Sequence, residues 1–572
     1  MNTADLNRRQ AVHLVQTLAA LGLKHAVLSP GARNTPVVLA LHDAVEQGCP
    51  IQLHSVVDER AAGFFALGLA RQTDTPVLLS CTSGSAAANY FPAVVEASEG
   101  AVPLIVVTAD RPAELQNCGA PQAMAQVALF GVHVRRSISL EAPEVADATS
   151  LVSQATRDLW AASVFPAPGP VHLNLRFRKP LWSPDSTATI DAPVAPVVPR
   201  PSSCDPACIQ RLVEFVDGQA GVIVVGPDPS GRLKGEDIDQ LSRWLQWPVL
   251  ADPVSQLRFG ADVPVIHHHD ILLRSARFRE LHPYTRAIHL GGTTSSRPLE
   301  ELLRRTPTVP IGASGRRWDP WGSVDWSLEA SLAAVMQAVA QAAVRPQTPD
   351  HREQWQAADR VVAEGLVERC SGDLWEGSIA HHFVQALPAG ALLRIASSMP
   401  IRDVDSFCVD SGRTLRVSAN RGVNGIDGTV ATTLGEAAAI QQPVGLLTGD
   451  LSLIHDIGAL TTAPRPSNPV VITVVDNGGG GIFGYLPMRE HETAFEPWYV
   501  TPHQHDIPAI ARAMGVAVHT PDSLDACKNA WNEALAHCGV TVVHVRIDRE
   551  ESTARHYEVW SALTAHLDEV LG

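Results

Sequence analysis

Short runs of Val, Ile, Leu and Ala recur along the chain and alternate with longer stretches whose apolar residues follow a helical period. A continuous apolar run of this kind is typical of a strand buried on both faces, and such strands form parallel sheets covered by helices. The pattern therefore predicts an α/β fold of doubly wound sheets, which bind ligands beyond the carboxyl ends of their strands. The expected strands are residues 25–30, 76–81, 103–110, 221–226, 247–252, 287–292, 443–450, 468–477 and 540–548.

Two proline-rich stretches interrupt this pattern. The first runs from Pro184 to Pro201, and the second is the segment RPQTPD at residues 345–350. Because proline fixes φ and lacks a backbone donor, both stretches are typical of extended linkers. We therefore expect three doubly wound α/β domains, at residues 1–185, 200–345 and 350–572.

Composition narrows the class of protein. The chain has 572 residues and a formal net charge of −16, which disfavours general nucleic-acid binding because that needs a basic surface. No apolar run is long enough to span a membrane, and the N-terminal segment lacks the apolar core of a signal peptide. The nine cysteines are scattered and odd in number, so we expect reduced thiols and a cytoplasmic protein.

Charged residues follow several strands of the first third. Arg33 lies in the loop after the first strand, Glu59 opens a helix after a strand expected to end at Val57, and Arg111 follows a third strand. The small residues of segment 82–89 let a ligand approach the backbone. Taken singly, Arg33 would suit a solvated loop and Glu59 would suit a helix N-terminus. Together they indicate a site for an anionic ligand.

The last third carries a pattern typical of a metal–diphosphate site. Asp450 ends one expected strand and Asn477 ends the next, followed by glycines at 478–481. Asp450, Asn477 and the carbonyl of Gly479 would offer oxygen ligands to Mg²⁺, and diphosphate oxygens and water would complete its shell. The helix expected at 451–456 would direct its N-terminus at the phosphates. Gly-Asp alone is common at turns, whereas the spaced pair of motifs is more specific.

Other conspicuous residues favour structural interpretations. Successive residues of His267–His269 point in different directions and do not suit one metal ion. The tryptophans at 318, 321 and 326 are expected to pack a loop, and Cys204 with Cys208 to lie on a helix surface.

The motifs resemble the family of 2-succinyl-5-enolpyruvyl-6-hydroxy-3-cyclohexene-1-carboxylate (SEPHCHC) synthases, thiamine-diphosphate-dependent enzymes of menaquinone biosynthesis. The resemblance covers essentially the whole chain and is weakest in the middle third. It is carried by SPGARNTP, VVDERAAGFFALGLAR, CTSGSAAANYFPAVVEAS, PLIVVTADRPAEL, ANRGVNGIDGTVAT, LTGDLSLIHD and VVDNGGGGIFGYLP.

The resemblance implies a pyrimidine-binding domain, a non-catalytic central domain and a diphosphate-binding domain, in that order. It implies thiamine diphosphate with Mg²⁺ or Mn²⁺, and a homodimer or homotetramer whose active sites lie between subunits. The implied reaction decarboxylates 2-oxoglutarate and adds the remaining unit to the ring alkene of isochorismate. The cofactor supplies the electron sink, and the protein binds, orients and desolvates.

The resemblance also implies roles for single residues. Glu59 would hydrogen-bond the pyrimidine ring, Gln122 would aid proton handling or positioning, and Ile426 would bend the cofactor. The other implied cofactor-binding residues are Ser83, Arg421, Gly449, Asp450, Leu451, Ser452, Asn477, Gly479, Ile482 and Phe483. Implied substrate-binding residues are Arg33, Arg111 and Arg297 for isochorismate, Ser398 and Arg402 for the distal carboxylate of 2-oxoglutarate, and Leu486 in the thiazolium pocket.

Three positions depart from the family pattern, and all fall on the isochorismate side. Ala32 replaces a serine, Pro121 an asparagine and Ser296 a lysine. One alternative is another thiamine-diphosphate enzyme, such as an acetolactate-synthase-like carboligase or a 2-oxo-acid decarboxylase, for which Arg402 would have no distal carboxylate to bind. The other is a non-catalytic nucleotide-binding or scaffold protein, which would tolerate loss of Glu59.

Overall fold

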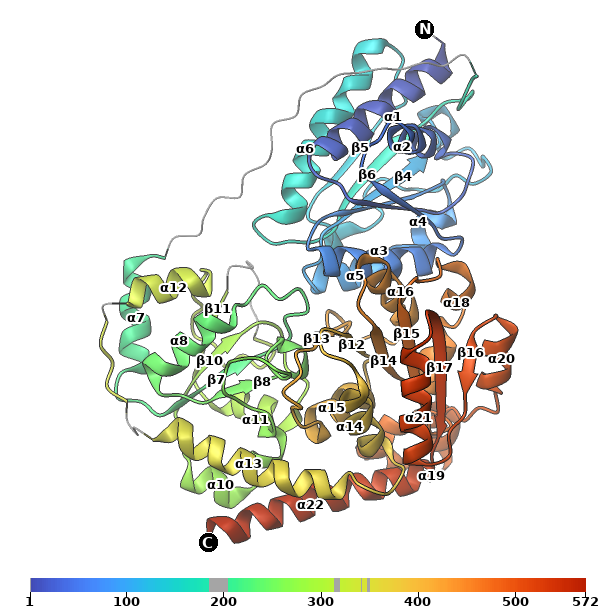
Figure 1. Ribbon diagram of the computed structural model, residues 1–572. Coiled ribbons are helices and arrows are strands. Elements are labelled where there is room, and N and C mark those ends of the chain that lie inside the picture. The colour runs from blue at the N-terminus through green and yellow to red at the C-terminus, as the bar shows by residue number, and fades with distance from the viewer. Residues whose placement is uncertain (1, 185–203, 313–318, 341, 347–349) are drawn as a thin grey trace. The chain divides into compact units, whose positions relative to one another are not determined.

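The computed structural model describes residues 2–184, 204–312, 319–340, 342–346 and 350–572 (Figure 1). The described strands form three sheets in which all paired strands are parallel. The predicted fold class, doubly wound parallel sheets covered by helices, is confirmed. The chain divides into two compact units, which are treated separately below. Unit 1 holds residues 1–200, 420–441 and 455–466, and unit 2 holds residues 201–419, 442–454 and 467–572.

Unit 1 contains a six-stranded sheet in the order β2-β1-β3-β4-β6-β5. Its strands are β1 (His25–Leu28), β2 (Gln52–Ser55), β3 (Val77–Cys81), β4 (Leu104–Asp110), β5 (Ser137–Leu140) and β6 (Val171–Arg176). The strands predicted at 25–30, 76–81 and 103–110 are confirmed. The expectation that Val57 ends a strand is wrong, because β2 ends at Ser55 and the side chain of Val57 is 65% exposed just before the helix cap.

The helices of unit 1 cover this sheet and include two that come from the last third of the chain. They are α1 (Thr3–Ala20), α2 (Thr35–Glu46), α3 (Glu59–Thr73), α4 (Ser85–Asn89), α5 (Phe91–Glu99), α6 (Leu151–Val164), α16 (Thr429–Ala439) and α18 (Ala459–Thr462). Helices α3 and α16 pack very closely. A Cβ on Gly435 would lie 2.0 Å from the Phe65 carbonyl oxygen, and one on Gly68 would lie 2.3 Å from that of Thr432. Glycine is therefore required where these helices meet.

Unit 2 contains two sheets, in the orders β11-β10-β7-β8-β9 and β13-β12-β14-β15-β17-β16. The first has β7 (Gly221–Val225), β8 (Val249–Ala251), β9 (Val265–Ile266), β10 (Arg286–Leu290) and β11 (Thr308–Ile311). The second has β12 (Leu392–Ile395), β13 (Arg416–Ser418), β14 (Val444–Gly449), β15 (Pro469–Asp476), β16 (Ala517–His519) and β17 (Gly539–Arg546). All six strands predicted in this part of the chain are confirmed.

The helices of unit 2 flank both sheets. They are α7 (Pro206–Val216), α8 (Gly235–Leu245), α9 (His269–Leu272), α10 (Ala276–Leu281), α11 (Arg297–Arg305), α12 (Leu332–Val339), α13 (His351–Arg369), α14 (Glu376–Ala386), α15 (Met399–Phe407), α19 (Glu492–Phe495), α20 (Ile507–Ala513), α21 (Leu524–Leu535) and α22 (Arg549–Leu571). Helix α17 (Asp450–Asp456) follows β14 directly.

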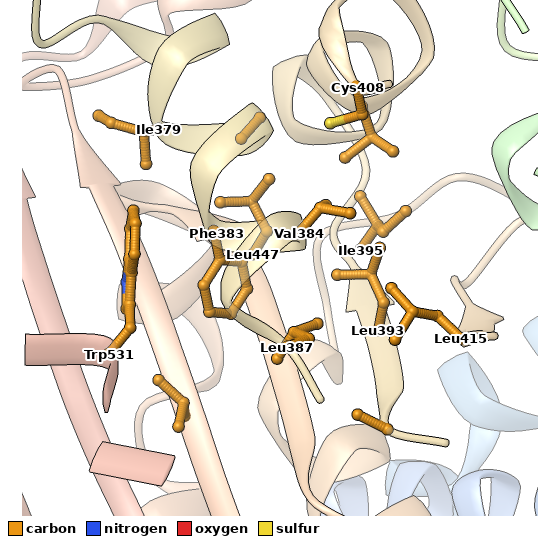
Figure 2. Close-up of a cluster of buried hydrophobic side chains, with 14 of the residues drawn as sticks. Ile379, Phe383, Val384, Leu387, Leu393, Ile395, Cys408, Leu415, Leu447 and Trp531 are labelled. Atoms are coloured by element: carbon orange, nitrogen blue, oxygen red, sulfur yellow. The ribbon is translucent and has the colours of Figure 1, made fainter. Parts of the chain in front are cut away.

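A buried apolar cluster fixes helices α14 and α21 against the second sheet of unit 2 (Figure 2). The ring centroids of Phe383 of α14 and Trp531 of α21 lie 5.5 Å apart, with the two rings tilted by 52°. The indole nitrogen of Trp531 donates a hydrogen bond to the hydroxyl of Thr473 on β15 at 3.0 Å, so burying this large ring leaves no polar atom unpaired. This core holds rigid the strands whose ends carry the candidate metal ligands.

The predicted linkers lie largely outside the described residues, which omit 185–203 and 347–349, as does Trp318. The three domain ranges stay a prediction. His268 and His269 have different partners: the His268 ring contacts Asp359 at 3.1 Å and the His269 ring contacts the Ile266 carbonyl at 3.3 Å. Cys208 lies in α7, but Cys204 precedes that helix, so the expected helix-surface pair is wrong.

Candidate functional site

The carboxyl ends of four neighbouring strands in unit 1 carry the predicted residues. Strands β2, β1, β3 and β4 are consecutive in the sheet and parallel. Glu59, Arg33, Ser83 and Arg111 follow these strands in that order. Because parallel strands end at one edge, the structure brings these four residues to the same rim.

Glu59 is the first residue of α3, but it does not cap the helix. The Asp58 side chain accepts hydrogen bonds from the backbone nitrogens of Arg60 at 2.9 Å and Ala61 at 3.3 Å. The half-buried Glu59 carboxylate makes no hydrogen bond to another residue in the described part of the chain. Asp58 therefore satisfies the helix terminus and leaves the Glu59 carboxylate available to a ligand.

Arg33 is buried, with only 2% of its surface exposed. Its Nη1 donates to the Phe177 carbonyl at 2.7 Å, and its backbone nitrogen donates to the Thr82 hydroxyl at 3.0 Å. Its Nε is also buried and has no partner among the residues the structure describes. The guanidinium is thus fixed at the rim with donor capacity remaining.

The loop that carries Gln122 lies against the loop after β3. Gln126 accepts a hydrogen bond from the Gly84 nitrogen at 2.9 Å, and a Cβ on Gly84 would lie 3.4 Å from Cα of Gln122. Arg111 donates through Nε and Nη2 to the Pro121 carbonyl at 3.1 and 2.8 Å. The structure therefore groups Gln122 with Ser83 and Arg111, and the proline at 121 still supplies the carbonyl that anchors the arginine.

The segment that holds Arg421 and Ile426 is anchored within unit 1. Glu96 of α5 accepts hydrogen bonds from the backbone nitrogens of Gly422 at 2.9 Å and Val423 at 2.8 Å. The Thr429 hydroxyl donates to the Ile426 carbonyl at 2.9 Å. Ile426 thus sits half-buried in a loop that is tied down on both sides, as a rigid apolar wedge requires.

Asp450 and Asn477 lie side by side at the ends of adjacent strands in unit 2. Strands β14 and β15 are parallel, with Gly449 paired to Val475. The Asp450 carboxylate accepts from the backbone nitrogens of Leu451 at 2.6 Å and Gly479 at 2.8 Å. These bonds draw the glycine segment back over Asp450 and bring all three predicted metal ligands together.

The amide of Asn477 is oriented like that of a cation ligand. Its Nδ2 donates to Oε1 of Glu376 at 2.8 Å, whereas its Oδ1 is buried without a hydrogen-bond partner in the described residues. A Cβ on Gly481 would lie 2.3 Å from Nδ2, so a side chain at this position would displace the amide. A buried acceptor without a partner is costly unless it binds a ligand. Among the residues that the structure describes, the carbonyl of Gly479 accepts one backbone hydrogen bond, from the Gly481 nitrogen at 2.9 Å, which leaves a lone pair.

Sequence reasoning did not identify His503 and Asp476 as possible metal ligands. His503 places Nε2 at 3.1 Å from Oδ2 of Asp450, and ligand atoms of Asp450, Asp476 and His503 all lie within 4.8 Å of one another. Burial raises the pKa of Asp450 to about 6. Burial also acts to raise the pKa of Asp476, but hydrogen bonds from His544 and from the Gly478 nitrogen, with the other contacts of this carboxylate, together outweigh burial and lower the pKa to about 2. A divalent cation would offset the cost of these buried carboxylates, so the residues present fit a metal ion.

Ser398 and Arg402 lie at the start of α15, which follows β12, the neighbour of β14. The exposed Arg402 donates through Nη1 to the Ser398 carbonyl at 2.7 Å. Ser398 has a left-handed backbone with φ of 77°, which is strained for a non-glycine residue and is common at functional sites. Both residues therefore share the strand-end rim of Asp450 and Asn477.

Comparisons with known proteins match the stretches of chain that carry both sets of residues. Residues 8–129 match the family described as thiamine pyrophosphate enzyme, N-terminal TPP binding domain, and residues 410–545 match the C-terminal TPP binding domain. A SEPHCHC synthase from Myxococcus xanthus is 37% identical over 99% of each chain. One from Thermosynechococcus vestitus is 38% identical over 98% of this chain and 99% of its own.

The chain belongs to the SEPHCHC synthase family. It is therefore an enzyme of the thiamine-diphosphate-dependent kind, and the non-catalytic alternative is not favoured. The benzoylformate decarboxylase of Polynucleobacter necessarius shares the fold, with a TM-score of 0.72 and 16% identity over 96% of this chain and 99% of that one. Among the helices of the described residues, none has the length and apolarity to cross a membrane.

The remaining positions implied by the SEPHCHC synthase family fall on or beside two elements. Ile482, Phe483 and Leu486 are half-buried in and just after the short 3₁₀ helix at Gly481–Tyr485, which follows the metal-ligand segment. Arg297 is exposed as the first residue of α11, the helix that follows β10 in the first sheet of unit 2. The hydroxyl of Ser296, where the family has lysine, caps α11 by accepting from the Leu299 nitrogen at 3.3 Å and also donates to Asp270 at 2.8 Å.

Proposed function

We propose that the protein decarboxylates 2-oxoglutarate and adds the remaining four-carbon unit to isochorismate, giving SEPHCHC and CO₂. The observation that carries the proposal is the oxygen set of Asp450, Asn477 and Gly479, with a buried unpartnered Oδ1, in a chain of this family. The alternatives within the wider class, acetolactate-synthase-like carboligases and simple decarboxylases, do not need the charged residue at position 402.

Thiamine diphosphate would supply the electron sink for decarboxylation and carbon–carbon bond formation. Asp450, Asn477 and the Gly479 carbonyl would hold Mg²⁺ or Mn²⁺ against the diphosphate, with Gly449, Leu451 and Ser452 close to the phosphates. The carboxylate of Glu59 would hold a proton at the pyrimidine ring nitrogen, which its release from helix capping supports. Gln122 would orient groups beside Ser83.

The substrates are dicarboxylates, which suit arginine donors. Arg402 and Ser398 would bind the distal carboxylate of 2-oxoglutarate, because both lie at the strand-end rim of unit 2. Arg33 and Arg111 would bind isochorismate from the rim of unit 1, and Arg297 would contribute from α11. Ile426, Phe483 and Leu486 would exclude water around the reacting atoms.

We also propose a homodimer or homotetramer in the cytoplasm, with each active site built by two subunits. Active sites at a subunit interface are what the resemblance to the SEPHCHC synthases implies. The three predicted domain ranges, 1–185, 200–345 and 350–572, would then be pyrimidine-binding, central and diphosphate-binding domains.

Release of CO₂ tests the substrate assignment. The purified protein, with thiamine diphosphate and Mg²⁺, is given either 2-oxoglutarate or pyruvate, and the released CO₂ is measured with and without isochorismate. We expect 2-oxoglutarate to be decarboxylated and pyruvate to be left nearly untouched. Faster turnover of pyruvate would contradict the assignment and favour an acetolactate-synthase-like enzyme.

A further inference from the structure

The amide of Asn477 can bind a cation only in one of its two orientations. An amide has two donors on nitrogen and an acceptor on oxygen, and rotation by half a turn exchanges them. Nδ2 of Asn477 lies 2.8 Å from Oε1 of Glu376, and Oδ1 is left facing away from it. A carboxylate offers only acceptors, so the rotated amide would set oxygen against oxygen.

Glu376 is itself held firmly. It is the first residue of α14 and is buried, with 6% of its surface exposed, and its backbone nitrogen donates to the Ser552 hydroxyl at 3.4 Å. Its Oε2 lies 3.7 Å from Nε2 of His556, which also contacts Oδ1 of Asp403 at 2.8 Å. Residues from α14, α15 and α22 thus converge behind the candidate metal site.

The His556 ring faces an acceptor on each side. Its Nδ1 lies 2.7 Å from the Ser552 carbonyl, which only accepts, and its Nε2 faces the Asp403 carboxylate. An imidazolium donates on both sides and places a positive charge between two buried carboxylates. The contact with His556 thus helps to hold the Glu376 carboxyl group at a fixed place, which is what orienting a neighbouring amide requires.

We propose that Glu376 is a positioning residue that orients the Asn477 amide and thereby turns Oδ1 toward the cation. The inference rests on the proposed metal–diphosphate site. Glu376 does not touch the cation or the cofactor; it acts through Asn477. Residues that orient a metal ligand in this way typically change metal affinity on the order of ten- to a hundredfold when they are replaced.

Exchanging the hydrogen-bond donor and the acceptor between positions 376 and 477 tests the proposal. Mg²⁺ is titrated by calorimetry in the presence of saturating thiamine diphosphate, and the melting temperature of the cofactor-free protein is measured in parallel. The proteins are wild type, E376Q, N477D, the double variant, and E368Q as a control at an exposed position on α13. The double variant keeps the net charge of wild type, and its new amide can donate to its new carboxylate.

We expect E376Q to weaken Mg²⁺ binding on the order of ten- to a hundredfold next to the native asparagine. In the N477D background the same substitution should instead strengthen binding, because it replaces a repelling carboxylate with a donor. E368Q should bind as wild type does. If E376Q does not fold, Glu376→Asp carries the comparison: its shortened carboxylate should weaken binding next to the native asparagine, and unchanged affinity would refute the proposal.

Two outcomes overturn different claims. If E376Q changes Mg²⁺ affinity equally in both backgrounds, or in neither, Glu376 is a structural residue and the positioning role is wrong. If wild type itself shows no Mg²⁺ binding with thiamine diphosphate, the proposed metal–diphosphate site falls, and this inference falls with it.

Discussion

Two adjacent acidic residues at the start of α3 have separate tasks. Asp58 caps the helix through two backbone hydrogen bonds, whereas Glu59 makes no cap bond. Replacing Asp58 with alanine should lower the free energy of unfolding by about 1 kcal/mol. Glu59→Gln should leave stability and Mg²⁺ binding nearly unchanged and remove most turnover. Chemical denaturation and steady-state assays of both variants check this, and normal turnover in Glu59→Gln would refute the proposed role.

The guanidinium of Arg402 gives a second prediction for a single residue. It is exposed, and within the described parts of the chain it donates to the Ser398 carbonyl and forms no salt bridge, so its charge is available to a ligand. Arg402→Ala should raise the KM for 2-oxoglutarate at least about tenfold, since losing a charged hydrogen bond costs about 1.5–3 kcal/mol. The KM for isochorismate should change little. A matching rise in both KM values would show that Arg402 does not discriminate between the substrates.

Sequence reasoning found those site residues that directly follow apolar strands and missed those brought in by loops. Asp450 and Asn477 could be paired because both end strands that the pattern reveals. His503 comes from a loop with no periodic pattern, and its contact with Asp450 depends on a long-range fold. Glu376 was also missed, because a glutamate at a helix start has an ordinary capping explanation.

Among elements, the packing of α3 against α16 leaves no room for a side chain. Gly435→Ala would place Cβ 2.0 Å from a backbone oxygen, which cannot move independently of its helix. We expect a loss of roughly 1–3 kcal/mol in unfolding free energy, exceeding the gain in helix propensity. Gly458→Ala is the matched control, since nothing lies within 4 Å of its Cβ. Equal stability of the two variants would contradict the close packing, and urea denaturation decides between these results.

A comparison of the predicted strands with those in the structure shows which strands can be recognised from sequence. Long buried strands such as β4 and β15 are continuous apolar runs and were predicted with nearly correct ends. The edge strands β5, β13 and β16 were missed, and they are short and partly exposed, so their residues need not be apolar. The interior strands β6 and β12 were missed as well, although they are buried. In the first sheet of unit 2, where the resemblance was weakest, β7, β8 and β10 were predicted, whereas the short strands β9 and β11 were not.

At the scale of the molecule, buried histidines should make stability depend on pH. Burial lowers the pKa of His172 to about 4, while in the unfolded chain it titrates near its ordinary value of 6.5. Between pH 6.5 and 4 the unfolded chain binds a proton at His172 that the folded protein does not bind. The stability contributed by neutral His172 is therefore complete above pH 6.5 and is lost as the pH falls toward 4. His172→Gln should be less stable than wild type at pH 7.5, and this gap should close by pH 5. A gap independent of pH in thermal melts would contradict this.

The central claim is that this chain, with thiamine diphosphate and a divalent cation, joins 2-oxoglutarate to isochorismate. The most direct measurement is the mass of the product formed when the protein is mixed with isochorismate, 2-oxoglutarate, thiamine diphosphate and Mg²⁺. The account predicts a product whose mass is the sum of the two substrates less CO₂, formed only when cofactor and metal are both present. Unchanged isochorismate under these conditions, or a product that forms without thiamine diphosphate, would contradict it.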